Sequence, residues 1–379
     1  MTALLNRRLI LLRDRMARFA AHTVASRADL HAMEEFPRDL WEEFAREGLF
    51  GLALSRCCGG SGGVFLDLAV AGDALVHHGH NPGVALTWLM HEMTSRIFIA
   101  GSGTTAQKAR YLSGMARGEI TASLAVSEPG TGAHPKHLKT RAEKRGSSYL
   151  INGEKAYLTN GPIADLFIVV AVTDISGERK EFTSFLVPAD TPGFSRTVPL
   201  KLSILRPSPH GGILLRDCEV PATAILGRKG RAYEDASVRF RTFEDVLGMA
   251  PGVGGMSRQL ELAAAMIGSK TPSPDDATAM ALGTLRMLKD TMRILAYTGA
   301  TMLGARTTPQ EAVSLAVAFR RLAGEFQETL ARTLAAHSLT AEGELALLTA
   351  DLTGMLSIAK NVAALRQKKL GASLIPGAH

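Results

Sequence analysis

Residues 121–173 carry the clearest structural pattern in the chain and read TASLAVSEPGTGAHPKHLKTRAEKRGSSYLINGEKAYLTNGPIADLFIVVAVT. Two apolar segments, 121–127 and 165–173, have the composition of β-strands and enclose a polar middle that is rich in glycine. The first segment runs into Ser127-Glu128-Pro129-Gly130-Thr131-Gly132, where one proline and two glycines predict a turn. Such a turn leaves backbone N–H groups free for a ligand. We therefore expect a ligand site between the two strands.

A second polar edge follows at Tyr157-Leu158-Thr159-Asn160-Gly161. An aromatic ring and a hydroxyl two residues apart on an extended segment lie on the same face. Tyr157 would therefore offer a flat ligand a stacking surface, and Thr159 would offer it a hydrogen bond. Either turn alone would be read as an ordinary β-turn, but the two together predict a site for a flat ligand.

Composition places the chain among ordinary globular proteins, with 46% hydrophobic and 21% charged residues in 379. The longest apolar run, Leu166 to Val172, is strand-sized and too short for a membrane span, so we expect a soluble protein. The net charge of +7 is spread along the chain, which gives nucleic-acid binding little support. Cys57, Cys58 and Cys218 form neither a disulfide framework nor a zinc-ligand spacing, so a reducing compartment fits.

The first thirty residues are rich in arginine and carry apolar residues at helical spacing. A transit peptide has a similar composition, but a first amphipathic helix is the commoner meaning of this pattern. We interpret the segment as a helix and expect a cytoplasmic protein. Its spaced apolar residues are Leu4, Leu5, Leu9, Leu12, Met16 and Phe19.

The hydrophobic period divides the chain into three predicted domains. A helical pattern with breaks at Pro37, Gly48 and the glycine-rich loop Gly59 to Gly63 predicts an all-α domain over 1–120. Short apolar stretches separated by turn residues predict a β domain over 121–230. Long helical patterns then return and predict a bundle of four helices over 231–379. The fold class is α+β. The strands are expected at 121–127, 165–173, 183–187 and 212–217, and the helix breaks near 271–274, 307–309 and 341–343.

The paired motifs resemble those of the acyl-CoA dehydrogenases, flavoproteins that desaturate an acyl thioester between its α and β carbons. The first signature of that family, aromatic-x-x-Thr-Glu-Pro-Gly-x-Gly-Ser-Asp, is similar to residues 124–134, LAVSEPGTGAH. The second, Asn-Gly-x-Lys-x-Trp-Ile-Thr-Asn-Gly, is similar to residues 152–161, NGEKAYLTNG. Glycine and proline punctuation extends the resemblance over about residues 35 to 230.

The resemblance implies that two helical domains pack around a central β-barrel and that FAD lies between the barrel and the C-terminal bundle. Ser127 and Gly132 would then meet the isoalloxazine ring and the phosphates, and Thr159 the edge of the ring at N5 and O4. Tyr157 would replace the usual tryptophan against the ring. The FAD-binding residues implied by the two motifs are Ala125, Ser127, Gly132, Ala133, Tyr157 and Thr159.

The family reaction also needs a carboxylate base for the α proton. Most members place it in the final helix, where the alignment puts Ser357 with no acid nearby. Isovaleryl-type members place it about ten residues before a glycine in the first C-terminal helix, and Glu244 has that spacing. A neighbouring register puts Thr242 there. A solvated helix carboxylate is an equally good interpretation of Glu244.

Four further motif positions differ from the family. Ala133-His134 replaces a Ser-Asp pair, and Asp245 stands where an arginine near the CoA tail is expected. The FAD-contacting Arg-x-x-Phe-Gly and Gln-x-x-Gly-Gly segments align with 266–274 and 336–340, which lack those residues. These differences put FAD affinity and CoA recognition in question.

The remaining candidate motifs do not predict a metal or nucleotide site. His77, His78 and His80 form an HHxH cluster at a helix end, where a polar cap is commoner than a metal site. Gly130-Thr131-Gly132 lacks the third glycine of a dinucleotide fingerprint, and no P-loop motif occurs.

We therefore expect an FAD-dependent dehydrogenase of an acyl thioester carried on CoA or on an acyl carrier protein. Electrons would pass to an electron-transfer flavoprotein or to oxygen, and the C-terminal helices would form a homodimer or homotetramer. A second hypothesis is a non-catalytic member that keeps the fold as a binding or assembly subunit. A third is a flavin oxidase or monooxygenase on the same scaffold.

Overall fold

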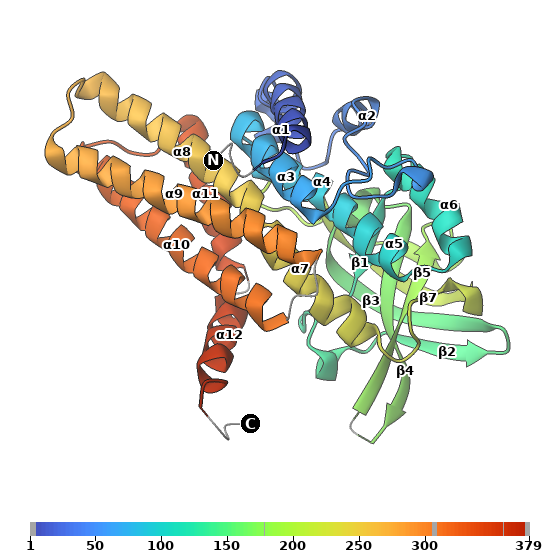
Figure 1. Ribbon diagram of the computed structural model, residues 1–379. Helices are drawn as coiled ribbons and strands as arrows, with labels where there is room; N and C mark the ends of the chain where they lie inside the picture. Colours follow the sequence, from blue (N-terminus) through green and yellow to red (C-terminus); the bar gives the residue numbers. More distant parts are fainter. Residues whose placement is uncertain (1–4, 178, 305–308, 359, 376–379) are drawn as a thin grey trace. The chain divides into compact units, whose positions relative to one another are not determined.

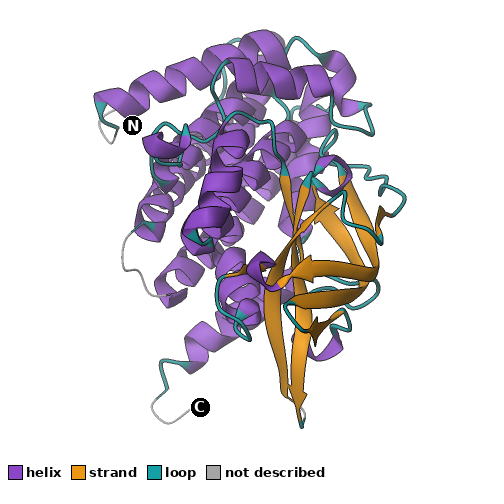
Figure 2. Ribbon diagram, turned by 90° about the vertical axis from the view of Figure 1, so that its right-hand side faces the viewer, coloured by secondary structure: helices purple, strands orange, loops and turns teal. Residues whose placement is uncertain are grey.

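A computed structural model describes residues 5–177, 179–304, 309–358 and 360–375 (Figures 1 and 2). Helices precede and follow a central sheet along the chain, so the predicted α+β class is confirmed. The helices before the sheet are α1 Arg7–Phe19, α2 Arg38–Arg46, α3 Phe65–Gly79, α4 Pro82–Met93, α5 Ala100–Ser102 and α6 Thr105–Ala116.

Two compact units make up the chain, and each is discontinuous in sequence. The first unit contains Met1–His31, Val64–Ala85 and Glu244–His379. The second contains Ala32–Gly63 and Leu86–Phe243. The sequence pattern followed the order of helices and strands along the chain, whereas the units follow contacts between distant segments.

Local signals explain where the early helices begin. The side chain of Asn6 accepts a hydrogen bond from the amide of Leu9 and caps α1. Thr104 and Gln107 form a capping box at the start of α6. Pro37 precedes α2, as the sequence predicted. Helix α3 is buried almost all round, which explains its continuous apolar sequence.

The central strands form an eight-stranded sheet in the order β6-β7-β3-β2-β4-β5-β8, and β1 pairs with β4. The strands expected at 121–127, 165–173, 183–187 and 212–217 are found as β1, β4, β5 and β7, with shifted ends. The bounds are β1 Ala122–Ala125, β2 Arg141–Arg145, β3 Ser148–Thr159, β4 Leu166–Ser176, β5 Arg179–Pro188, β6 Phe194–Arg196, β7 His210–Pro221 and β8 Ile225–Leu226.

The polar middle of residues 121–173 is not simply loop, because β2 and β3 form an antiparallel hairpin within it. One face of this hairpin is exposed and carries the polar residues that hide the strand pattern. The other face contributes Ala142, Tyr149 and Ile151 to the core. Alternation of polar and apolar residues is typical of a strand with one solvent-exposed face, and that signal was missed.

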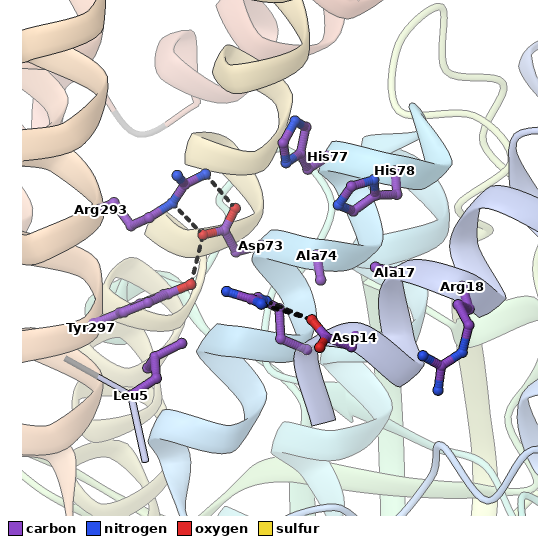
Figure 3. A pocket seen from close by; sticks show the side chains of 11 residues that line it. Leu5, Asp14, Ala17, Arg18, Asp73, Ala74, His77, His78, Arg293 and Tyr297 are labelled. Atoms are coloured by element: carbon purple, nitrogen blue, oxygen red, sulfur yellow. Dashed lines mark hydrogen bonds and ion pairs between the residues drawn. The ribbon is translucent and has the colours of Figure 1, made fainter. Parts of the chain in front are cut away.

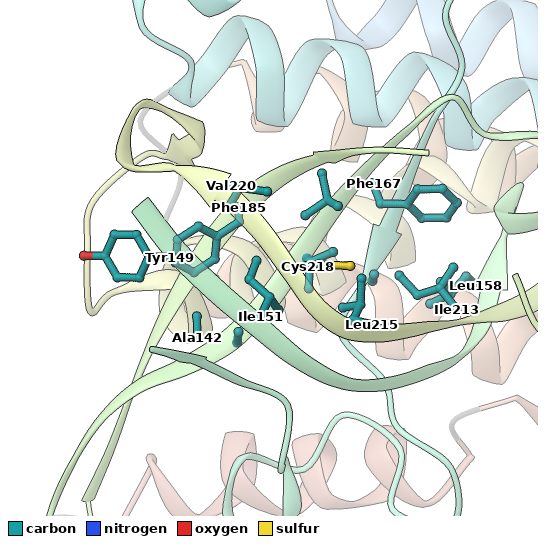
Figure 4. Packing of buried hydrophobic residues seen from close by; sticks show 14 of the residues in the cluster. Ala142, Tyr149, Ile151, Leu158, Phe167, Phe185, Ile213, Leu215, Cys218 and Val220 are labelled. Carbon is teal, nitrogen blue, oxygen red and sulfur yellow. The ribbon is translucent and has the colours of Figure 1, made fainter. Parts of the chain in front are cut away.

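The sheet curls around a single hydrophobic core, as the predicted barrel requires (Figure 4). Alternate residues of β1, β2, β3, β4, β5 and β7 point into this core. Tyr149 and Phe185 contact each other with ring centroids 5.0 Å apart. The core fixes the strand register, and therefore also fixes the loops that leave the strand ends.

Long helices form the C-terminal part of the chain, and α8, α9 and α10 run side by side (Figure 1). The predicted breaks near 271–274 and 341–343 are confirmed, and the break near 307–309 lies largely outside the described residues. These helices are α7 Arg239–Leu247, α8 Met249–Lys270, α9 Asp276–Leu303, α10 Pro309–Ala336, α11 Gly343–Ser357 and α12 Lys360–Ala372. Among the described residues, none of the helices is long and apolar enough to cross a membrane.

Candidate functional site

The two sequence motifs lie side by side in the second unit. The amide of Ala156 donates to the carbonyl of Ser127 over 2.9 Å. The hydroxyl of Ser123 donates to the carbonyl of Thr159 over 2.7 Å. The exit of β1 therefore runs along the end of β3, which brings together two segments about thirty residues apart in sequence.

The glycine turn after β1 is tighter than the sequence predicted. Glu128 and Gly132 exchange two backbone hydrogen bonds of 3.0 Å, and the amide of Thr131 also donates to Glu128. The amides of Thr131 and Gly132 are therefore used within the turn, so only some of the turn's amides are free as expected. Among the described residues, the amides of Ser127, Gly130 and Ala133 have no hydrogen-bond acceptor.

Gly130 and Gly132 are both required by the shape of the turn. Their φ angles are 73° and 59°, in the left-handed region that favours glycine. A Cβ atom built on either residue meets nothing within 4 Å, so the space above the turn is open. The hydroxyl of Thr131 is buried and has no hydrogen-bond partner among the described residues. The turn thus presents open space beside an unsatisfied polar atom.

A buried ion pair lies beneath this turn. Lys155 is completely buried, and its Nζ donates to Glu128 Oε1 over 3.0 Å and to the carbonyl of Val126 over 2.9 Å. The Glu128 carboxylate also accepts the amides of Lys139, over 2.7 Å, and Thr140, over 2.8 Å. Lys155 and Glu128 belong to the quoted motifs, but sequence reasoning assigned them no role. Their contacts show that they hold the turn against β3.

Charge and burial act in opposite directions on this pair. Burial alone would raise the pKa of Glu128, but Lys155 and the amides of Thr140 and Lys139 lower it overall. Burial lowers the pKa of Lys155 to about 8, against the opposing effect of Glu128. Between the lowered pKa of Glu128 and the pKa of Lys155 both groups are charged, and the pair links the turn to the sheet.

Tyr157 stands at an irregularity of β3. The register between β3 and β7 shifts between Lys155 and Leu158, and Tyr157 has a φ of 62°. The regular alternation assumed for Tyr157 and Thr159 is therefore broken by a bulge. The Tyr157 side chain is 56% exposed. A large aromatic residue held at positive φ and exposed is a feature that clusters at ligand sites.

Thr159 makes a contact that the sequence did not reveal. Its Oγ1 lies 3.0 Å from Nε2 of His210, and Nδ1 of His210 lies 3.0 Å from the carbonyl of Ser208. Since a carbonyl only accepts, Nδ1 carries the hydrogen, and Nε2 of the neutral ring accepts from the Thr159 hydroxyl. Burial lowers the pKa of His210. The only local signal in the sequence is the turn composition of Pro207-Ser208-Pro209 directly before His210, and it does not reveal this contact.

Asn160 explains the second half of the Thr-Asn-Gly motif. It has a φ of 63°, which asparagine tolerates better than most residues. Its Nδ2 donates to the carbonyl of Thr87 over 3.0 Å, and its amide donates to the carbonyl of Pro209 over 2.8 Å. Asn160 therefore fixes the end of β3 against α4 within the second unit.

The remaining predicted FAD residues lie on the same segment. The side chain of Ala125 is fully buried in the sheet core, so only its backbone faces outward. Ala133 is half-buried beside Gly132. Ser127 is also half-buried at the start of the turn.

Glu244, the predicted base, belongs to the first unit by contacts, whereas the motif residues belong to the second. It is half-buried on α7. The neighbouring Asp245 forms an ion pair with Arg366 of α12. Thr242, the residue of the alternative register, is also half-buried on α7. Ser357, at the expected late-base position, is exposed at the end of α11.

The two segments that lack the family's C-terminal FAD motifs contact each other in the first unit. Lys270 donates to the carbonyl of Ser338 over 3.3 Å. Thr278 and His337 approach within 3.0 Å. The side chains in and beside these segments therefore form their hydrogen bonds within the first unit.

The first unit contains a pocket of about 520 Å³, and none of the residues predicted to bind FAD or to act as the base lines it (Figure 3). Arg293 donates two hydrogen bonds to Asp73, of 2.6 and 3.0 Å, and the Tyr297 hydroxyl donates a third of 2.8 Å. His77 and His78 lie at its edge. Among the described residues, no group of three His, Cys, Asp or Glu side chains could hold a metal ion.

Two known family models match the sequence. The model described as acyl-CoA dehydrogenase, N-terminal domain, matches residues 8–119, and the model for the middle domain matches residues 123–218. The chain therefore belongs to the acyl-CoA dehydrogenase family.

Individual relatives agree with this assignment. Mitochondrial isovaleryl-CoA dehydrogenase of Pongo abelii is 32% identical over 225 residues, which are 58% of this chain and 53% of that protein. Short-chain specific acyl-CoA dehydrogenase of Clostridium acetobutylicum is 31% identical over 231 residues, 60% of each. The chain thus spans about half the length of the curated relatives it matches.

Solved structures show the same fold. Butyryl-CoA dehydrogenase from Megasphaera elsdenii superposes with a TM-score of 0.87 at 21% identity and covers 98% of both chains. A prolyl acyl carrier protein oxidase superposes with a TM-score of 0.85 at 25% identity, over 98% of this chain and 99% of that one. Helical, sheet and helical parts follow the same order throughout.

Proposed function

We propose that this protein is an FAD-dependent dehydrogenase of acyl thioesters. One observation carries the proposal: the two motif segments meet at the Ser127–Ala156 hydrogen bond, with an open glycine turn on one side and the exposed Tyr157 ring on the other. A flat, phosphate-bearing cofactor needs these parts together. It needs an aromatic wall, backbone donors and space that no Cβ atom fills.

The residues present fit a flavin. The free amides of Ser127, Gly130 and Ala133 supply donors, and the unpartnered Thr131 hydroxyl supplies a polar contact. Since the Thr159 hydrogen is donated to His210, the Thr159 oxygen remains an acceptor. Tyr157 supplies a stacking surface. When bound, the flavin would supply the acceptor for the β hydride.

Glu244 is the residue that we propose takes the α proton. A carboxylate within reach of the α carbon can accept that proton. It stands on α7, where isovaleryl-type members place their base, and the similarity to isovaleryl-CoA dehydrogenase supports this choice. No acid occupies the late position at Ser357.

The substrate is a thioester on CoA or on an acyl carrier protein. Asp245, which replaces the arginine expected near a CoA tail, is paired with Arg366. This pair removes a free cation from the place where CoA phosphates would be recognised, and so favours the carrier-protein form. The similarity to a prolyl acyl carrier protein oxidase supports the same choice. The electron acceptor would be an electron-transfer flavoprotein or oxygen.

We also propose a homodimer or homotetramer in the cytoplasm. Met280, Met287 and Ile294 are 72%, 65% and 46% exposed and recur every seven residues along α9. This spacing produces an apolar stripe along one side of the helix, which a second copy would cover. A monomeric mass by light scattering at micromolar concentration would contradict this part of the proposal.

The test is a visible spectrum of the protein reconstituted with FAD, followed by anaerobic addition of acyl thioesters. Matched acyl-CoA and acyl-carrier-protein substrates distinguish the two carriers. Bleaching of the flavin band supports dehydrogenation. A protein that binds no flavin points to the non-catalytic alternative, and flavin reduced only by other donors points to an oxidase or monooxygenase.

Two variants separate binding from chemistry. Glu244→Gln keeps the shape of the side chain but removes proton acceptance, so flavin binding persists while bleaching slows by about 100-fold or more. Glu234→Gln, at an exposed carboxylate preceding α7, is the matched control. Thr159→Val weakens flavin binding by removing the hydroxyl. Equal bleaching by parent and Glu244→Gln would show that Glu244 does not take the α proton.

A further inference from the structure

Cys57 and Cys58 lie in a turn that plays no part in the proposed reaction. Residues Arg56–Cys58 form a short 3-10 turn between α2 and the glycine-rich segment Gly59 to Gly63. The two sulfur atoms are 3.7 Å apart. Cys57 is exposed and Cys58 is half-buried. The turn therefore holds two thiols in contact, one of them open to solvent.

The backbone of this turn is fixed on both sides. The amides of Cys58 and Gly60 both donate to the carbonyl of Ser55, over 3.0 and 3.1 Å. Gly59 has a φ of 82°, and a Cβ atom on Gly60 would lie 2.4 Å from the carbonyl oxygen of Leu54. These glycines let the chain turn sharply directly after the cysteines. The contact between the thiols is therefore imposed by the local fold.

The surroundings give the two thiols different reactivity. The Ser55 hydroxyl lies 3.1 Å from Cys57 Sγ, and this hydrogen bond together with that from Cys58 lowers the pKa of Cys57. Burial raises the pKa of Cys58, with a smaller contribution from Cys57. The exposed thiol thus ionises first, and the thiolate is the nucleophilic form of cysteine. Cys57 is placed to attack and Cys58 to resolve.

We propose that Cys57 and Cys58 form a redox-active dithiol that a hydroperoxide oxidises to a disulfide between adjacent residues. The Cys57 thiolate attacks the O–O bond and becomes a sulfenic acid while the peroxide leaves as alcohol or water. The Cys58 thiolate then attacks Cys57 Sγ, the S–S bond forms, and the sulfenic oxygen leaves as water. Two thiols lose two electrons and two protons in total, and the hydroperoxide takes them up.

Geometry makes this disulfide easy to reduce again. Adjacent Cα atoms are about 3.8 Å apart, which is closer than the roughly 4.4–6.8 Å usual for disulfides. Strained and exposed disulfides are the labile ones, and they serve regulatory or catalytic roles more often than structural ones. The bridge is therefore suited to reversible oxidation.

Oxidation would change the conformation of the loop around Cys57 and Cys58, which hydrogen bonds hold to the rest of the second unit. The amides of Gly62 and Gly63 donate to the carbonyls of Leu54 and Leu52, over 2.7 and 2.9 Å. The amide of Gly51 donates to the buried carboxylate of Glu92 over 2.6 Å. Closing the Cys57–Cys58 ring changes the turn inside this bonded loop.

The test treats the whole, fully reduced protein with one equivalent of hydrogen peroxide and follows it by intact mass and peptide mapping. We expect a loss of 2 Da, about two protons, localised to the peptide holding Cys57 and Cys58, and full recovery with a dithiol reductant. Phenylarsine oxide, a reagent for paired thiols, should protect this peptide. The buried Cys218 serves as an internal control that stays reduced.

Two variants assign the roles of the thiols. Cys57→Ser should slow peroxide consumption at least tenfold, whereas Cys58→Ser should react at nearly the parent rate and accumulate a dimedone-reactive sulfenic acid at Cys57. Oxygen added to the peptide without loss of 2 Da, a disulfide between two protein molecules, or equal rates in both variants would each overturn the proposal. None of these outcomes depends on flavin.

Discussion

Each compact unit buries an ion pair between segments distant in sequence, and the two pairs are built differently. In the first unit, which we call the helical unit, the Asp73 carboxylate of α3 bonds only to side chains among the described residues, namely those of Arg293 and Tyr297 on α9. In the unit that contains the sheet, Glu128 and Lys155 bond to each other and also to backbone groups of the loop. A pair bonded to side chains fixes two regular helices against each other. A pair bonded to backbone fixes the shape of an irregular turn.

The largest effect is expected from Arg293→Met, because Asp73 would keep only the Tyr297 hydroxyl. Both side chains of the pair are mostly buried, at 15% and 6% exposure. Removing one partner of such a pair costs about 3–5 kcal/mol of unfolding free energy. Urea denaturation measures the change. The double variant Arg293→Met/Asp73→Ala should be less destabilised than the single one, and a single variant as stable as the parent would contradict the expectation.

Glu92 provides a contrast with Asp73 and Glu128, because it is a buried acid with no cation paired to it among the described residues. Burial raises its pKa from 4.5 to about 8, although the amide of Gly51 opposes the shift. The folded state keeps the proton up to about pH 8, whereas the unfolded state loses it above about pH 4.5, so the stability of the parent falls as the pH rises between these values. Glu92→Gln removes this loss.

The expected gain of Glu92→Gln is therefore small at pH 4 and grows to about 3–4 kcal/mol near pH 7–8. Thermal midpoints of parent and variant over pH 4 to 9 give the measurement. A difference that does not change with pH would show that Glu92 does not titrate in this range.

A smaller loss of stability is expected for Lys155→Met. Glu128 keeps the amides of Lys139 and Thr140, so the unfolding free energy should fall by only about 1–2 kcal/mol. The local effect is larger, because the turn loses its link to β3 and flavin retention should fall. Fluorescence titration with FAD tests this, with Lys144→Met at an exposed site on β2 as the matched control. Equal flavin affinity in parent and Lys155→Met would show that the Lys155–Glu128 pair does not contribute to flavin binding.

The smallest effect is expected at the surface. Arg38 and Glu42 form an ion pair of 3.0 Å along α2, with side chains 91% and 55% exposed. Solvent screens such a pair, so Arg38→Ala should leave the thermal midpoint unchanged within scan error. A shift of several degrees would mean that Arg38 packs against the protein through its aliphatic stem.

Neither ion pair was predicted from the sequence, but the motifs do contain Glu128 and Lys155, whereas no motif contains Asp73 or Arg293. Glu128 and Lys155 lie in recognisable motifs that glycine and proline punctuate, and the motifs identified the segments that meet. Asp73 and Arg293 lie in helices whose composition gives no hint that they face each other, since 220 residues separate them. Helical period predicts which face is buried, but not which buried polar groups pair.

The same distinction explains the errors at the candidate site. The positions of Ser127, Gly132 and Thr159 followed from the motifs. The bulge at Tyr157 and the Thr159–His210 contact depend on how β3 pairs with β7, which no local pattern encodes. The β2–β3 hairpin was missed because its exposed face is polar and hides the alternation.

Because the helical unit is built from three separate stretches of sequence, the two units cannot be completed at the same time during synthesis. Residues 64–85 of that unit precede the stretch 86–243 of the other unit, and two of the helices that pack on α3, α8 and α9, begin only after Glu244. During synthesis, α3 leaves the ribosome long before α8 and α9, and its apolar surface must wait for them. The unit containing the sheet has all of its residues as soon as Phe243 has emerged. We expect it to fold first, and a nascent chain arrested before α9 to expose α3 to chaperones.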